Sequence, residues 1–203
     1  MRNLVIVFAK NPVPGKAKTR LSKDIGQGQA MVVYRDLLRY TSALVEKVNA
    51  HRWVSYADFL NPCDMWPADK FQKSVQSSGN LGDRMVSAFQ KAHAERFESM
   101  VLIGTDAYDL NTEDIEQAFQ ALKSNDLVLG PTHDGGYYLI GMNRPWPELF
   151  EGIEWSTDSV FSTTLEKARK SKLSTFILPK KSDIDHVEDI PQSKLEELEI
   201  HHG

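Results

Sequence analysis

Short apolar segments alternate with amphipathic helical segments along this sequence, and this alternation restricts the fold more than any other feature. The run Leu4–Phe8 is apolar at every position, which is typical of a strand buried on both faces. Apolar residues then recur at helical spacing and predict a long amphipathic helix from about Gln27 to Val48. Strands that alternate with helices pair mostly in parallel. The predicted fold class is therefore a Rossmann-like α/β/α sandwich with a mostly parallel, mixed sheet.

The same two patterns continue toward the end of the chain. Further strands are expected at Trp53–Tyr56, Phe71–Val75, Met100–Ile103, Leu127–Leu129, Tyr137–Ile140 and Thr175–Leu178. Further helices are expected from Leu81 to about Phe97 with Asn80 as cap, after Asn111, and from a cap at Ser156 or Thr157 to about Lys170. Because the sequence has no internal repeat and no low-complexity linker, we expect a single domain over residues 1–203.

Charge and cysteine content exclude several classes of protein. The 24 Lys and Arg residues against 28 Asp and Glu residues give a net charge of −4, which disfavours nucleic acid as a partner. Cys63 is the only cysteine, so neither an intramolecular disulfide nor a cysteine cluster for zinc can form. No stretch approaches the length of a transmembrane segment. We therefore expect a cytoplasmic protein with a small anionic ligand, and the sequence gives no indication of its oligomeric state.

The segment FAKNPVPGKAKTRLS, residues 8–22, places a cationic loop directly after the first predicted strand. Ligands of parallel sheets bind beyond the carboxyl ends of the strands, so this loop lies where a ligand is expected. Gly15 lets the backbone approach a ligand closely, and Lys16, Lys18 and Arg20 can neutralise a diphosphate. The loop matches neither a Walker A loop nor a Rossmann fingerprint. A solvated basic turn explains its composition equally well.

The segment VLIGTDAYDL, residues 101–110, ends a predicted strand with an acidic residue. Asp106 is an oxygen ligand placed to hold Mg²⁺ or Mn²⁺ bound to phosphates, and Asp109 is close enough to help. Capping of the next helix by Asp109 or Asn111 is the structural alternative. This alternative explains Asp109 well, but Asp106 is too far upstream to act as a cap.

The segment GPTHDGGYYLIG, residues 130–141, combines glycines with polar residues at another strand end. Gly135 and Gly136 predict an open turn in which a bulky substrate can touch the backbone. His133 and Asp134 are candidates for acid–base chemistry or for binding a hydroxyl group. A plain hairpin turn explains the glycines without a ligand, and on chemistry alone it is the favoured interpretation.

The segment SDIDHVED, residues 182–189, has a functional and a structural interpretation. Asp183 or Asp185, together with His186, could complete the metal site. Asp185 and Glu188 also have the spacing of a capping box, which requires no ligand.

The segment SGNLGDRM, residues 78–85, is similarly open to two interpretations. Gly82 offers free backbone N–H groups at a helix start, and Arg84 adds positive charge. The N-terminus of a surface helix explains the same spacing, and on spacing alone it is favoured.

Taken together, these segments resemble one protein family. FAKNPVPGKAKTRL, GNLGDRM, LIGTDAYDL, LGPTHDGGYYLIG, WSTDSV and DIDHVEDI occur in the same order as in the bacterial DUF2064 proteins, over roughly Leu4 to Ile190. Proteins of this family are assigned as glycosyltransferases of the nucleotide-diphospho-sugar transferase superfamily, which has the GT-A fold. The resemblance implies a metal-dependent glycosyltransferase that moves a sugar from a nucleoside diphosphate-sugar to the hydroxyl group of a small-molecule acceptor.

The resemblance also assigns residues. Gly15, Lys16, Lys18 and Arg20 match the phosphate loop of the family, and Asp106 matches its metal-binding aspartate. With the candidates above, nucleotide or phosphate contacts are expected from Ala9, Lys10, Pro14, Gly15, Lys16, Lys18, Arg20, Gly82 and Arg84. Sugar or acceptor contacts are expected from His133, Gly135, Gly136 and Tyr137, with Asp134 as the catalytic base and Asp106, Asp185 and His186 as ligands of Mg²⁺ or Mn²⁺.

Two other functions remain compatible with these residues. The superfamily includes guanylyltransferases of the molybdenum-cofactor and F420 pathways, which resemble this chain in their first loop and release pyrophosphate from a nucleoside triphosphate. A non-catalytic nucleotide-binding relative is the other alternative. It is kept open because Tyr108 stands where the family usually has proline, and His186 where it often has threonine.

Overall fold

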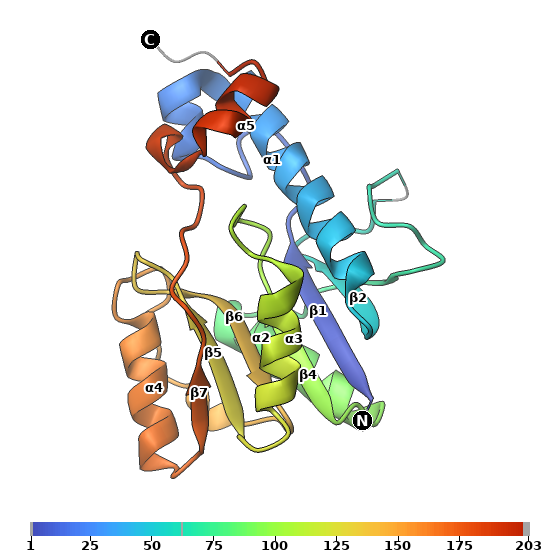
Figure 1. Cartoon of the computed structure of the whole chain (residues 1–203), viewed down its shortest axis with the longest axis vertical. Helices are drawn as coiled ribbons and strands as arrows, with labels where there is room; N and C mark the ends of the chain where they lie inside the picture. Colours follow the sequence, from blue (N-terminus) through green and yellow to red (C-terminus); the bar gives the residue numbers. More distant parts are fainter. Residues whose placement is uncertain (1, 62, 201–203) are drawn as a thin grey trace.

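The computed structural model describes residues 2–61 and 63–200, and at its centre is one seven-stranded sheet (Figure 1). Its strands are β1 (Asn3–Ala9), β2 (His51–Tyr56), β3 (Gln72–Val75), β4 (Ser99–Ile103), β5 (Leu127–Pro131), β6 (Tyr137–Met142) and β7 (Thr175–Ile177). Their order is β3-β2-β1-β4-β6-β5-β7, and only β6 runs antiparallel to its neighbours. The predicted fold class is confirmed.

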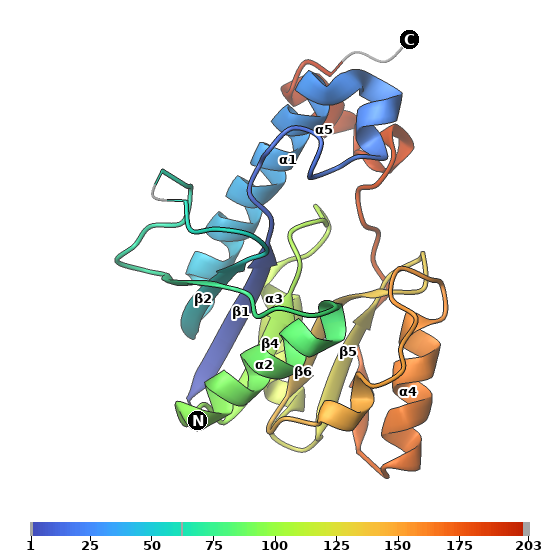
Figure 2. The same ribbon diagram turned by 180° about the vertical axis from the view of Figure 1, so that it is seen from behind.

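The helices cover both faces of the sheet, as the apolar strands require. They are α1 (Leu21–Lys47), α2 (Leu81–Ala94), α3 (Thr112–Ala121), α4 (Val160–Lys170) and α5 (Gln192–Glu197), with short 3₁₀ turns η1 (Pro147–Leu149) and η2 (Val187–Asp189). Alternate residues of β1 enter two separate cores: Val5 and Val7 pack with α1 and α3, whereas Leu4 and Ile6 pack with α2, η1 and α4. Figures 1 and 2 show these two layers from opposite sides. No helix in the described part of the chain is long and apolar enough to cross a membrane.

Several boundaries differ from the prediction for identifiable reasons. Helix α1 begins at Leu21 rather than near Gln27, because a short first segment joins it across a kink at Gly26, where φ is +78°. The caps predicted at Asn80 and Asn111 are confirmed, since each forms a reciprocal capping box with the acidic residue three positions later. The cap predicted at Ser156 or Thr157 is wrong, because α4 begins only at Val160.

The chain after β7 leaves the sheet and folds back against the first part of the molecule. Figures 1 and 2 show this segment rising from β7 to α5, which lies beside the N-terminal half of α1. Leu195 and Ile200 are buried in the same core cluster as Leu21 and Ile25. Helix α5 is not predicted from the sequence, because it is too short for a clear helical repeat. This packing places residues 182–189 next to the first loop.

Candidate active site at the carboxyl ends of the strands

A cleft of about 600 Å³ lies where the central strands end. Its wall is formed by Ala9 at the end of β1 and Lys10 directly after it, Lys18 and Arg20 of the first loop, Gly104, Thr105 and Asp106 after β4, Tyr137 of β6, and Asp185 of the C-terminal segment. Gln76, Leu81 and Arg84, between β3 and α2, line the same cleft. The ends of the parallel strands thus bring together residues that lie far apart in the sequence, at the edge where ligands of such sheets bind.

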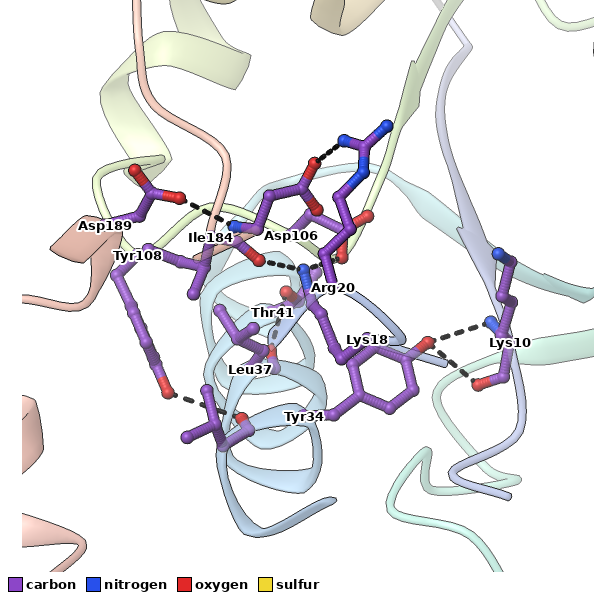
Figure 3. A network of polar contacts seen from close by, with 12 residues as sticks. Lys10, Lys18, Arg20, Tyr34, Leu37, Thr41, Asp106, Tyr108, Ile184 and Asp189 are labelled. Atoms are coloured by element: carbon purple, nitrogen blue, oxygen red, sulfur yellow. Dashed lines mark hydrogen bonds and ion pairs between the residues drawn. The ribbon is translucent and has the colours of Figure 1, made fainter. Parts of the chain in front are cut away.

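Lys18 connects the first loop to two other segments of this site. Its Nζ lies 2.5 Å from Oδ1 of Asp106 and donates a hydrogen bond of 2.6 Å to the carbonyl oxygen of Ile184. Figure 3 shows the lysine between these two partners. Its side chain is only 4% exposed, and its backbone has a φ of +51°, which is uncommon for a residue other than glycine. Lys18 is therefore not a solvated surface charge.

The other two cations of the loop are more accessible. Nη1 of Arg20 donates a hydrogen bond of 2.5 Å to Oδ2 of Asp185, and both side chains remain substantially exposed. Lys16 is exposed and has no ion-pair partner among the described residues. Gly15 has a φ of +78°, which allows the tight turn before Lys16. Two of the three predicted phosphate-binding cations thus face a carboxylate of the cleft.

Tyr34 fixes the beginning of the loop, and the sequence analysis did not identify it. Its hydroxyl accepts a hydrogen bond from the backbone nitrogen of Lys10 and donates one to the carbonyl oxygen of the same residue, both at 3.0 Å (Figure 3). Burial, and next the charge of Asp106, raise the pKa of Tyr34 to about 12, so the hydroxyl stays protonated. Because Tyr34 lies within the apolar repeat of α1, the pattern alone indicated only a core residue.

Four carboxylates gather beside these cations. Burial, and next the charges of Asp106, Asp134 and Asp185, together raise the pKa of Asp183 to about 7, while Lys18 opposes the shift. The structure therefore brings together the three predicted acids and adds Asp183, which the sequence offered as an alternative to Asp185. Such a concentration of like charge is unfavourable unless cations balance it.

His186 is not part of this acidic group, which corrects the predicted set of metal ligands. Its Nδ1 lies 3.0 Å from Oδ2 of Asp24 on α1. Among the described residues, no three His, Cys, Asp or Glu side chains are arranged to hold a metal ion. Magnesium sites at phosphates commonly use only one or two protein carboxylates, with phosphate oxygens and water as the other ligands. Asp106 with either Asp183 or Asp185 fits that kind of site.

The predicted capping box at residues 182–189 is displaced by one position. Oδ2 of Asp189, not Glu188, accepts hydrogen bonds from the backbone nitrogens of His186 and Asp185, at 2.7 and 3.0 Å. This leaves the side chain of Asp185 free to face Arg20. In this turn Asp189 therefore stabilises the backbone, whereas Asp185 is directed at the cleft.

Tyr108, where the family usually has proline, anchors the loop after Asp106. Its hydroxyl donates a hydrogen bond of 2.9 Å to Oδ2 of Asp36 on α1, which in turn lies 3.2 Å from Nζ of Lys194. Asp109, proposed as a helper of the metal site, instead accepts a hydrogen bond of 3.1 Å from the backbone nitrogen of Ser182. Both residues hold the loop and the C-terminal segment in place.

The turn at residues 132–136 is less open than predicted. Oδ1 of Asp134 accepts hydrogen bonds from Oγ1 of Thr132 and from the backbone nitrogen of Gly136, at 2.5 and 3.1 Å. Gly135 has a φ of +91°, and a Cβ there would lie 2.1 Å from the carbonyl oxygen of Asp158. This packing explains the glycine without a ligand, and contact of a substrate with its half-exposed backbone stays a prediction. His133 and Asp134 are exposed beside the cleft rather than in its wall, whereas Tyr137 lines it.

The start of α2 also differs from the expectation. A Cβ on Gly82 would lie 2.7 Å from the indole of Trp155, so packing against that ring explains the glycine. Arg84 faces the cleft, and its Nη1 donates a hydrogen bond of 3.3 Å to Oε1 of Gln76. The sequence does not indicate Gln76, because a single glutamine after an edge strand has no distinctive pattern.

Comparison with known proteins identifies the family. A family model described as "Uncharacterized protein conserved in bacteria (DUF2064)" matches residues 24–157. The chain belongs to the DUF2064 family. No curated protein was found to match the sequence. One similar solved structure is a protein from Desulfovibrio desulfuricans G20 that is named as a nucleotide-diphospho-sugar transferase. Its sequence is 32% identical and its TM-score is 0.86, and the match covers 92% of this chain and 84% of that one.

More distant structures share the fold of this DUF2064 protein. The inositol-1-phosphate CTP transferase from T. maritima is 15% identical with a TM-score of 0.61, over 98% of this chain and 95% of that one. The 4-diphosphocytidyl-2C-methyl-D-erythritol synthase from Anaerococcus prevotii DSM 20548 is 11% identical with a TM-score of 0.58, over 93% and 92% of the two chains. The resemblance inferred from the sequence motifs is thus confirmed, and the fold is that of the nucleotide-diphospho-sugar transferases.

Proposed function

We propose that this protein is a divalent-cation-dependent glycosyltransferase that transfers a sugar from a nucleoside diphosphate-sugar to a hydroxyl acceptor. The observation that carries the proposal is the pairing of Lys18 with Asp106 and of Arg20 with Asp185 inside one cleft. Cations and acids that lie side by side at the carboxyl edge of the sheet can separate to take up a ligand that itself combines negative phosphates with a positive metal ion.

Charge balance supports a metal-bound diphosphate over a free anion. Around Asp183 the charges of Asp106, Asp134 and Asp185 raise its pKa, and only Lys18 opposes them. A phosphate at this point would add to the local negative charge, whereas a diphosphate with Mg²⁺ or Mn²⁺ would reduce it. Asp106 with Asp183 or Asp185 would hold the ion, which, when bound, neutralises charge that develops on the departing diphosphate.

Lys18 and Arg20 would bind the phosphate oxygens and stabilise the leaving group. Lys18 is already oriented by the carbonyl oxygen of Ile184, so it needs little reorganisation when it exchanges Asp106 for a phosphate. Arg20 is more exposed and would move with Asp185 as the ligand enters. Removing one such preorganised donor typically raises a reaction barrier by about 3 kcal/mol.

Asp134 is our candidate for the base that takes the proton from the acceptor hydroxyl. Only its Oδ1 is engaged in the turn, and the carboxylate is exposed next to the acidic group. The hydrogen bonds to Oδ1 hold the side chain in position, so that Oδ2 is available to an acceptor. Tyr137, in the wall of the cleft, would contact the sugar.

The alternative reaction is nucleotidyl transfer with release of pyrophosphate. Solved structures with this fold include enzymes named as cytidylyl- or CTP transferases, and a cationic first loop would suit a leaving pyrophosphate equally well. The exposed turn with Asp134 beside the cleft favours the glycosyltransferase, because attack on a sugar by a neutral hydroxyl group requires a base at the acceptor.

Product analysis separates the two reactions. The protein is incubated with Mn²⁺ and a panel of nucleoside diphosphate-sugars or of nucleoside triphosphates, and the products are identified by mass spectrometry. We expect slow release of free sugar and nucleoside diphosphate from at least one sugar nucleotide, with water as acceptor, and loss of this activity in Asp134→Asn. Pyrophosphate from a triphosphate, with every sugar nucleotide intact, would replace this proposal by the alternative. If nothing binds or reacts, both are wrong.

A further inference from the structure

The end of the cleft between β3 and α2 has features that the diphosphate site does not use. Gln76 directly follows the edge strand β3, while Leu81 and Arg84 lie three residues apart and therefore on one face of the first turn of α2. All three line the cleft. Arg84 is one of the residues for which the sequence predicts phosphate binding, together with Lys18 and Arg20.

Sheet topology places this group away from the diphosphate site. Gln76 follows β3 and Asp106 follows β4, and these strands are separated by β2 and β1. Three strand spacings correspond to about 14 Å. If the diphosphate lies at Lys18 and Asp106, a ribose directed toward β2 would bring its base to Gln76, Leu81 and Arg84.

Leu81 gives this end of the cleft an apolar surface. It is 45% exposed, although it is a large hydrophobic residue, whereas Met85 one turn later is buried. Of the large hydrophobic residues that are exposed in the described part of the chain, Leu81 alone lines the cleft. An apolar side chain next to hydrogen-bonding groups suits the face and the edge of a nucleobase.

The hydrogen bonds of this group leave donors rather than acceptors available. Nε2 of Gln76 donates a bond of 2.9 Å to the carbonyl oxygen of Ser55, and its Oε1 accepts from Nη1 of Arg84. Nε of Arg84 donates a bond of 3.1 Å to the carbonyl oxygen of Gly79. The Nη2 group of Arg84 has no acceptor among the described residues. These bonds fix the orientation of both side chains, and the guanidinium retains unused N–H groups.

We propose that Gln76, Leu81 and Arg84 make this cleft selective for nucleotides with a keto base, uracil or guanine, over those with an amino base, cytosine or adenine. This inference rests on the proposed binding of a nucleoside diphosphate-sugar. A keto oxygen accepts hydrogen bonds from the guanidinium, whereas the exocyclic amino group of cytosine or adenine would direct its own donors at the donors of Arg84. Leu81 packs against the face of either kind of base and does not discriminate.

Binding of the four diphosphates tests the selection directly. Titration calorimetry with Mg²⁺ measures the affinity of the protein for UDP, CDP, GDP and ADP. We expect UDP to bind at least about tenfold more tightly than CDP, or GDP at least about tenfold more tightly than ADP. The pair that shows the larger ratio identifies the base as a pyrimidine or a purine.

Variants of the two polar residues separate base recognition from a structural role. In Arg84→Gln the keto-to-amino affinity ratio should fall to near one, whereas a merely structural arginine would change all four affinities by the same factor. In Gln76→Glu the ratio should also fall, because a carboxylate pairs with Arg84 and repels a keto oxygen. Arg169→Gln, an exposed arginine on α4, is the matched control and should keep the wild-type ratio. Circular dichroism of each unliganded variant checks that it is folded.

The outcomes distinguish this inference from the proposed function. Equal affinities for keto and amino nucleotides, or tighter binding of CDP and ADP, would overturn base selection and leave diphosphate binding intact. A wild-type ratio that persists in Arg84→Gln would overturn the role of Arg84. If no nucleotide binds with or without Mg²⁺, the proposed function fails and the inference fails with it.

Discussion

The first loop, residues 11–20, and the turn at residues 132–136 both follow buried strands at the same edge of the sheet, and both combine glycine with charged residues. Their side chains are nevertheless used differently. Lys18 and Arg20 bond to Asp106, Ile184 and Asp185, which are distant in the sequence. Asp134 bonds within the turn, to Thr132 and Gly136.

This difference shows which features of a strand end indicate a ligand. A turn that satisfies its own polar groups is stable without other segments, so its residue types alone are weak evidence for binding. A cation that depends on carboxylates from other segments is positioned by the whole fold, and those partners can be exchanged for a ligand. We therefore expect mutations in the first loop to alter binding and mutations of the turn's glycines to alter mainly stability, whereas Asp134, whose Oδ2 is not engaged in the turn, is expected to affect activity.

The largest effect is expected for Asp106→Asn. Loss of this carboxylate should abolish metal-dependent binding of a nucleoside diphosphate, because it removes a ligand of the ion and leaves Lys18 without its ionic partner. Calorimetry with Mn²⁺ measures the affinity, and Asp69→Asn, an exposed aspartate outside the cleft, serves as control. Unchanged affinity in Asp106→Asn would exclude Asp106 from the metal site.

Gly135→Ala should destabilise the protein by about 3 kcal/mol, because the new methyl group meets the backbone of Asp158 and the φ is positive. Thermal unfolding should then shift down by about 6–12 °C for a chain of this size. Gly28→Ala is the matched control, since Gly28 lies in α1 with no atom near its Cβ position, and it should not lower the unfolding temperature. If both variants unfold at the same temperature, the turn is not packed as described.

Lys18→Ala should weaken diphosphate binding by about 1.5–3 kcal/mol, the usual contribution of a charge-assisted hydrogen bond. Arg20→Ala should have a similar or smaller effect, because its side chain is more exposed, and Lys16→Ala the smallest. Calorimetry of the three variants under identical conditions gives the order. If Lys16→Ala weakens binding more than Lys18→Ala, the buried lysine is a structural residue and not a phosphate ligand.

Without divalent cations, Asp183→Asn should stabilise the protein by about 1–2 kcal/mol at pH 8. This gain is a fraction of the free energy that corresponds to the raised pKa of Asp183. A carboxyl whose folded pKa, about 7, exceeds its ordinary value of 3.8 makes the folded state less stable as the pH rises through that interval. The gain should therefore disappear near pH 4, where the wild-type group is protonated. Denaturant unfolding at both pH values measures the difference in free energy of unfolding between the variant and the wild type. An equal gain at pH 4 would rule out burial and repulsion of the charged carboxylate as the cause.

The fold could be predicted because its signals are local. The apolar run of β1, the helical repeat of α1 and the caps at Asn80 and Asn111 depend only on residues close in sequence. The short helix α5 was not predicted, because its stability comes from packing against α1 and not from a repeat of its own.

The candidate site could be predicted only in part, since the sequence indicates residue types at strand ends but not their partners. It indicated Lys18, Arg20 and Asp106, whereas their pairing depends on how the C-terminal segment packs. The orientation of His186 toward Asp24, and the contact of Trp155 with Gly82, likewise join positions distant in the sequence. Tyr34 and Gln76 were missed for the same reason.

The segment after β7 has a consequence for the order in which the protein matures during synthesis. Every strand of the sheet precedes residues 182–200 in the order of synthesis, yet these residues carry Asp183 and Asp185 and hold Lys18 through the carbonyl oxygen of Ile184. The wall of the cleft therefore lacks Asp185 until this segment has been made. Asp183 and Asp185 join the site only when the C-terminal segment packs against α1, so we expect the proposed metal-bound substrate to bind only after this packing step.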